Sequence, residues 1–188
     1  LFSTDWRYST SSGKVHLQNN IHEKDSFKKV MEWSIYLLEW VKSQGKPVEY
    51  VVVPWNHDEQ KTFFYGTALQ YYFGDSLPVT VEKNRAYIKR GNTMIALGHG
   101  DNEKPNNFLQ FAYDEFLSKL DVPLEKLHWY LGNQHKQIVS QNGTMLIKNL
   151  LAPNPKSDWT KSKGYDMVQG MHWFGRDKQE WEILEVRW

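Results

Sequence analysis

The residues best suited to metal binding or catalysis follow three short apolar stretches of the sequence. They are Asn56, His57, Asp58, His99, Asn133 and His135. They supply imidazole nitrogens with amide and carboxylate oxygens, and no thiolate joins them because the chain has no cysteine. Such donors suit Mn, Fe or Zn better than Ca, and pairs of these ions typically serve phosphoryl transfer. A histidine outside the ligand set can donate a proton or stabilise charge on the phosphate.

The chain alternates predicted helices and strands, which indicates an α/β sheet. Helical spacing of apolar residues predicts helices over 25–43, 58–73 and 106–120. Short apolar runs predict strands over 48–54, 94–97 and 127–131, each ending at one of the polar groups above. Because ligands of open α/β sheets bind beyond the carboxyl ends of the strands, we expect these polar groups to share one site.

The last third of the sequence is richer in predicted strands. Residues 137–139 and 145–150 flank Gln141-Asn142-Gly143, which is typical of a hairpin turn, and 180–186 alternates as a closing strand. No internal repeat, low-complexity tract or linker divides the sequence. We therefore expect a single domain over 1–188.

Composition narrows the classes of partner. The 188 residues carry 23 Lys and Arg against 22 Asp and Glu, so the net charge of +1 gives no field that favours nucleic acid over the whole surface. The longest apolar run, around 50–53, is too short to cross a membrane. The tryptophans Trp129, Trp159, Trp173 and Trp181 offer base-stacking surfaces to a single strand, a hypothesis that competes with their burial in the core.

Three motifs resemble those of the calcineurin-like metallophosphoesterases. Val53-Pro54-Trp55-Asn56-His57-Asp58 resembles the family's Gly-Asn-His-Asp motif, and Leu97-Gly98-His99-Gly100-Asp101 resembles its single-histidine motif. Leu131-Gly132-Asn133-Gln134-His135 resembles its Gly-His-x-His motif. Together with segments within 150–165, the pattern is similar to phage and prophage phosphoesterases related to the nuclease subunit of double-strand-break repair complexes. The resemblance implies an α/β, metallophosphoesterase-like sheet sandwich flanked by helices.

The resemblance also implies a role for each candidate residue. Asn56, His99 and Asn133 would bind the second metal ion, and His135 would bind the first. His57 would be the catalytic histidine that faces the scissile phosphate, and Asp58 would support the site by orienting its neighbours. The implied cofactor is a pair of divalent ions, with Mn expected first and Zn, Fe or Mg as alternatives.

The sequence departs from the family pattern in three places. Asn133 replaces a histidine, and an amide is a weaker ligand than imidazole for transition metals, so we expect a weakened second site. Trp55 replaces a glycine that would permit close backbone approach. The family's upstream Asp-x-His and Gly-Asp motifs are not found, and 1–5 resembles the stretch that follows them. We therefore expect a family fold that is incomplete at its N-terminus.

Two main functions follow as hypotheses. The first is a metal-dependent phosphoesterase or phosphodiesterase, a phage or prophage DNA nuclease-like hydrolase in the cytoplasm of a bacterial host. The alternative is a catalytically degenerate metallophosphoesterase scaffold that binds a protein or nucleic acid. A third hypothesis is a single-strand binder that acts through aromatic side chains and lysines. The expected partners are a phosphodiester substrate such as DNA and either a second copy or another chain that supplies the missing ligands, with no membrane.

Overall fold

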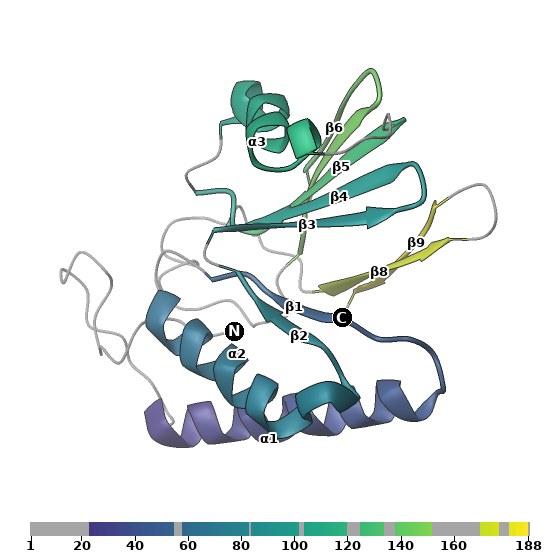
Figure 1. Cartoon of the computed structure of the whole chain (residues 1–188). Helices are drawn as coiled ribbons and strands as arrows, with labels where there is room; N and C mark the ends of the chain where they lie inside the picture. The colour runs from purple at the N-terminus through teal and green to yellow at the C-terminus, as the bar shows by residue number, and fades with distance from the viewer. Residues whose placement is uncertain are drawn as a thin grey trace, which may run out of the picture. The chain divides into compact units, whose positions relative to one another are not determined.

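The computed structural model describes residues 23–54, 58–82, 84–101, 104–119, 125–133, 138–151, 170–176 and 181–187. The chain divides into two compact units, Leu1–Asn84 and Arg85–Trp188. Each unit combines helices with strands (Figure 1). The α/β class predicted from the sequence is therefore confirmed. The single domain over 1–188 and the sandwich arrangement of sheets stay predictions.

The first unit is a helix-covered pair of parallel strands. In chain order its elements are α1 (Glu23–Ser43), β1 (Tyr50–Val52), α2 (Glu59–Phe73), the 3-10 turn η1 (Gly74–Ser76) and β2 (Val79–Val81). Tyr50 lies opposite Val79 in the β1–β2 pair, and α2 provides the crossover that parallel strands require. Its buried core consists of Leu38, Val52, Tyr65, Leu69, Phe73 and Leu77.

Hydroxyl groups tie the helices of this unit to its strand. Tyr65, fully buried on α2, donates to Ser34 Oγ on α1 at 2.8 Å. Because Tyr65 gives its one proton to Ser34, Tyr50 is the donor in the 2.9 Å bond between the two tyrosine hydroxyls. Burial, with the neighbouring Tyr65, raises the pKa of Tyr50 above its ordinary value. Tyr50 therefore stays protonated at physiological pH, and the two hydrogen bonds join α1, β1 and α2.

The second unit contains a five-stranded mixed sheet flanked by a helix. Its elements are β3 (Arg85–Arg90), β4 (Thr93–Gly98), η2 (Pro105–Asn107), α3 (Phe108–Glu115), η3 (Leu117–Lys119), β5 (Lys126–Leu131), β6 (Ile138–Asn142), β7 (Met145–Asn149), β8 (Gly170–Arg176) and β9 (Trp181–Arg187). The sheet order is β3-β4-β5-β7-β6, and β8 and β9 form a separate antiparallel pair.

The centre of the large sheet is parallel. β4 pairs with β5 and β5 with β7 in the same direction, whereas β3 and β6 join their neighbours as antiparallel hairpins. Gly98 lies opposite Leu131, and Leu131 lies opposite Asn149. The chain segments after β4, β5 and β7 therefore leave the sheet at one common edge.

Trp129 is the central core residue of the second unit. It is fully buried, stacks on Phe108 of α3 at a centroid distance of 4.8 Å and meets Tyr87 edge-on at 5.8 Å. The surrounding cluster comprises Met94, Ala96, Phe108, Ala112, Leu127, Leu131 and Ile147. A ring buried in this way cannot stack on a nucleic-acid base, so the base-stacking hypothesis is wrong for Trp129. Trp159 and the side chains of Trp173 and Trp181 lie outside the described residues.

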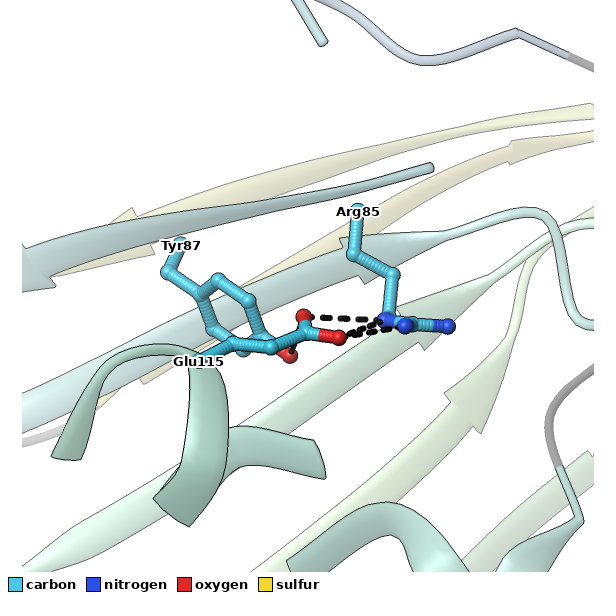
Figure 2. Close-up of polar contacts among 3 residues, drawn as sticks. All are labelled: Arg85, Tyr87 and Glu115. Atoms are coloured by element: carbon cyan, nitrogen blue, oxygen red, sulfur yellow. Dashed lines mark hydrogen bonds and ion pairs between the residues drawn. The ribbon is translucent and has the colours of Figure 1, made fainter. Parts of the chain in front are cut away.

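A charged cluster clamps α3 to the edge strand β3 (Figure 2). Arg85 on β3 forms a bidentate ion pair with Glu115, the last residue of α3, and its Nε lies 3.0 Å from Glu115 Oε2. Tyr87 donates its hydroxyl to the same carboxylate at 2.7 Å. The guanidinium also lies over the Phe111 ring at 4.4 Å. Because the contacts are charge-assisted and partly buried, they hold the end of α3 on the sheet.

The opposite face of β5 and β7 buries titratable side chains. His128, Tyr130 and Lys148 alternate with the core residues of these strands and are all nearly inaccessible. Burial, with a smaller contribution from Lys126, lowers the pKa of His128, and burial raises the pKa of Tyr130 to about 12. His128 is therefore held in its neutral form at neutral pH.

Several predicted elements differ in extent from the observed ones. The strand predicted over 48–54 is confirmed only at Tyr50–Val52, where two of three side chains are half-buried instead of covered on both faces. The helix predicted over 106–120 shortens to Phe108–Glu115, because 3-10 turns replace its two ends. β2 and β3 were not predicted, since β2 has three residues and β3 is interrupted by charged side chains. Among the described helices, none combines the length and apolar composition that a membrane crossing requires.

Candidate functional site

Two of the predicted site residues meet at the carboxyl edge of the second unit's sheet. His99 follows β4 directly, and Asn133 follows β5 after a single glycine. The two loops are joined by a backbone hydrogen bond in which Gly132 N donates to Gly98 O at 3.4 Å. A Cβ atom at Gly132 would lie 3.4 Å from His99 Nδ1, so the buried imidazole packs directly against the second loop. The structure thus places the loops of His99 and Asn133 in contact at adjacent strand ends, and that the two residues share a functional site stays a prediction.

Asn133 bridges the two loops with its side chain. Its Nδ2 donates to Gly100 O at 3.2 Å. Its backbone φ of 55° lies in the left-handed region, which asparagine and histidine enter more readily than most residues. Because the amide nitrogen is used in this bond, the amide oxygen is the atom left to accept a donor or to ligate a cation. The same side chain can thus support the loop and contribute one oxygen donor.

Asn149 is a further member of this arrangement. It ends β7, the third parallel strand, is nearly inaccessible, and donates from Nδ2 to Gly132 O at 3.3 Å. The next residue, Leu150, donates its backbone N–H to Leu131 O at 2.7 Å. Asn149 therefore fixes the loop that carries Asn133. Asn149 was not predicted, although a polar residue at the end of a third buried strand is the same signal that indicates the other two positions.

Asp58 lies in the first unit, between β1 and α2. It is fully buried and occupies the N-cap position of α2, where its backbone carbonyl accepts the N–H of Thr62 at 2.8 Å. Its side chain makes no capping hydrogen bond. Lys61 on the first turn of the same helix is also fully buried, and sequence analysis had not indicated it. The supporting role predicted for Asp58 stays a prediction.

The other three predicted site residues, Asn56, His57 and His135, lie outside the described residues. Within the described part of the chain, no group of three or more His, Asp or Glu side chains is placed to hold a metal ion. His99 and Asn133 offer one imidazole and one amide oxygen, donor types that fit Mn, Fe or Zn. Two donors are fewer than such ions normally take from a protein, and the further ligands that the resemblance implies, Asn56 and His135, lie outside the described residues.

Comparisons with known proteins returned structural matches alone. No protein-family model matches the chain, and no curated protein matches its sequence. Vps29 from Chaetomium thermophilum is 15% identical, with 80% of this chain and 84% of that one covered and a TM-score of 0.36. Wild-type Vps29 complexed with Zn²⁺ from Entamoeba histolytica is 13% identical, with 81% and 88% covered and a TM-score of 0.41. At these values the functional interpretation depends on this chain's own residues.

Proposed function

We propose that this chain is a metallophosphoesterase-type domain that binds divalent metal and a phosphodiester, and that the loops following β4 and β5 contribute to this site. The observation that supports the proposal is the meeting of His99 and Asn133 at the carboxyl ends of two adjacent parallel strands. Two of the three motifs that resemble the metallophosphoesterase family are thereby brought together. A site at this edge of an α/β sheet is also where ligands of such folds commonly bind.

In this proposal each residue has a defined task. His99, Asn133, His135 and Asn56 would hold the metal, which when bound supplies positive charge that stabilises the phosphoryl transition state. His57 would donate its imidazole N–H to a non-bridging phosphate oxygen. Gly132 packs against the His99 ring, and Asn149 donates a hydrogen bond to the Gly132 carbonyl. The finer proposal, a DNA nuclease of phage or prophage type, rests on the resemblance of the three motifs.

The second candidate function is a catalytically degenerate scaffold that binds a protein or nucleic acid. The contact between Asn133 Nδ2 and Gly100 O favours it, because this bond gives Asn133 a structural task that requires no metal. In this case the two loops would be retained as a rigid surface. The two candidates differ in whether the chain binds a divalent ion tightly.

Metal titration distinguishes them. Isothermal titration with Mn²⁺ and Zn²⁺, together with Mn-dependent hydrolysis of bis(p-nitrophenyl) phosphate and of linear DNA, is expected to show at least one tightly bound ion and activity that EDTA abolishes. Asn133→His should tighten metal binding, because imidazole is the stronger ligand and histidine tolerates the backbone conformation at this position. Asn106→His, at an exposed asparagine, is the matched control and should change nothing. Less than one tight ion per chain with no hydrolysis would exclude the enzyme.

A further inference from the structure

We propose that an exposed aromatic face of α1 is the interface between two copies of this chain. The face, called here the α1 stripe, consists of Trp33, Tyr36, Leu37 and Trp40. These residues recur at intervals of three and four and so share one side of the helix. The opposite side, with Phe27, Val30, Met31, Ile35 and Leu38, packs into the core of the first unit. The helix therefore has two apolar faces, and the described core of its own unit contacts one of them.

The α1 stripe is too apolar for a surface that faces water alone. Trp33 is 66% exposed, Tyr36 74% and Trp40 52%. With about 150–250 Å² for a whole aromatic side chain, these three present roughly 300–480 Å². That area is as large as the largest apolar patch of a typical monomer. Two facing copies would bury roughly 600–960 Å² from these rings alone, about half of a standard protein interface, before their polar neighbours are counted.

Charge favours a second copy over nucleic acid or a membrane surface. The four acidic side chains of α1, Glu23, Asp25, Glu32 and Glu39, balance its four lysines, Lys24, Lys28, Lys29 and Lys42. Anionic partners attract helices rich in Lys and Arg, and α1 has no such excess. A neutral helix can lie against an identical helix without net repulsion. The partner that fits the α1 stripe is thus another α1 stripe.

The spacing of the stripe also fits an antiparallel arrangement. The spacing of the four stripe residues along the sequence is three, one and three, which is the same in either chain direction. A two-fold axis between Tyr36 and Leu37 therefore places Trp33 over Trp40 of the other copy. In this arrangement Lys29 faces the uncharged Gln44 and Glu32 faces Val41 of the other copy. A parallel arrangement would instead place Lys29 beside Lys29 and Glu32 beside Glu32, which is unfavourable. Antiparallel packing also opposes the two helix dipoles.

Sedimentation of the full chain tests the proposal. We expect a reversible monomer–dimer equilibrium between about 1 and 100 μM, because the interface is smaller than standard. Trp33→Glu should raise the dimer dissociation constant by about thirty-fold or more, as loss of a central aromatic anchor does. Tyr71→Glu is the control, since Tyr71 is 87% exposed on α2 and lies outside the stripe. A chain that stays monomeric throughout this range, or dimers that Trp33→Glu leaves intact, would overturn the proposal.

Disulfide trapping tests the arrangement without relying on a charged variant that folds poorly. The chain lacks cysteine, so each introduced thiol reports on one position. Tyr36→Cys should cross-link to itself under mild oxidation, whereas Trp33→Cys alone should not, because the antiparallel arrangement separates the two thiols by about 10 Å along the helix. A mixture of Trp33→Cys and Trp40→Cys chains should form the mixed dimer. Self-linked Trp33→Cys would show a parallel pair and refute the antiparallel interface, and an unlinked Tyr36→Cys would refute both.

Discussion

Replacing Gly100 by alanine should destabilise the second unit through the loop that carries His99. Gly100 has φ of +90°, a region that residues with a Cβ rarely adopt, and a Cβ there would lie 3.3 Å from Leu131 Cβ. The backbone cost of such a conformation is about 1–3 kcal/mol. The close contact adds to it, because Leu131 is a core residue held on β5 and moves only if the sheet moves. We therefore expect Gly100→Ala to lower the free energy of unfolding by about 2–3 kcal/mol.

Gly143→Ala is the matched control for this prediction. Gly143 lies in the turn between β6 and β7 of the same sheet, has φ of +58°, and a Cβ there would meet nothing within 4 Å. It therefore carries the backbone cost without the contact, and its expected loss is about 1 kcal/mol. The difference between the two variants reports the contact of the His99 loop with Leu131 together with the different backbone angle of Gly100.

Urea unfolding followed by circular dichroism measures both variants. Gly100→Ala should lower the midpoint more than Gly143→Ala at an unchanged slope, and its melting temperature should fall by about 4–12 °C. Equal losses for the two variants would refute the close approach of the His99 loop to Leu131. A loss in Gly143→Ala alone would refute the assigned backbone conformation at Gly100 as well.

Two further predictions concern the side chains that fix the sheet and its helix. Glu115→Ala removes the shared acceptor of Arg85 and Tyr87 and should lower the free energy of unfolding by about 1–3 kcal/mol in urea titration. The control Glu39→Ala, in the exposed ion pair with Lys42, should lower it by less than about 0.5 kcal/mol. Equal effects would contradict the role of Glu115 in holding α3 on the sheet. Burial lowers the pKa of His128, so the unfolded chain binds more protons than the folded one just below pH 6.5, and stability should fall as the pH drops through that range. His128→Gln should flatten this dependence in melts between pH 5 and 7.5, and an unchanged slope would show that His128 is not its source.

The sequence indicated the strand ends at His99 and Asn133 better than it indicated the residues that hold their loops in place. The strand ends at His99 and Asn133 could be identified because an apolar run stops abruptly at a polar residue in both cases. The role of Asn149 and the close packing of Gly100 were not predicted, because they depend on contacts with β5 and the loop after it, which are distant in the sequence. The periodicity of apolar residues indicates which side chains share a face within one helix or strand. It does not predict a hydrogen bond between two loops.

Helix patterns showed the same limit. The apolar pattern of 25–43 predicted α1 almost to its ends. In the structure Leu37 belongs to the exposed side, with Trp33, Tyr36 and Trp40. A helix with two apolar faces gives a broad pattern that cannot reveal which face its own core uses. β3 was not predicted for a related reason. Its charged residues Arg85, Lys89 and Arg90 are untypical of a strand, and the ion pair between Arg85 and Glu115 of α3 cannot be inferred from the sequence.

The mixed sheet has a consequence for the order in which this unit forms. Its margins, β3–β4 and β6–β7, are hairpins between chain neighbours and can close quickly. At its centre β4 pairs with β5 and β5 pairs with β7. Thr93 there lies opposite Lys126, and Leu127 lies opposite Met145, so each pair joins residues that are far apart in the sequence. Such non-local pairings form slowly. Because His99, Asn133 and Asn149 all extend from these central strands, we expect the arrangement of these three residues to form late, after the hairpins at the margins of the sheet.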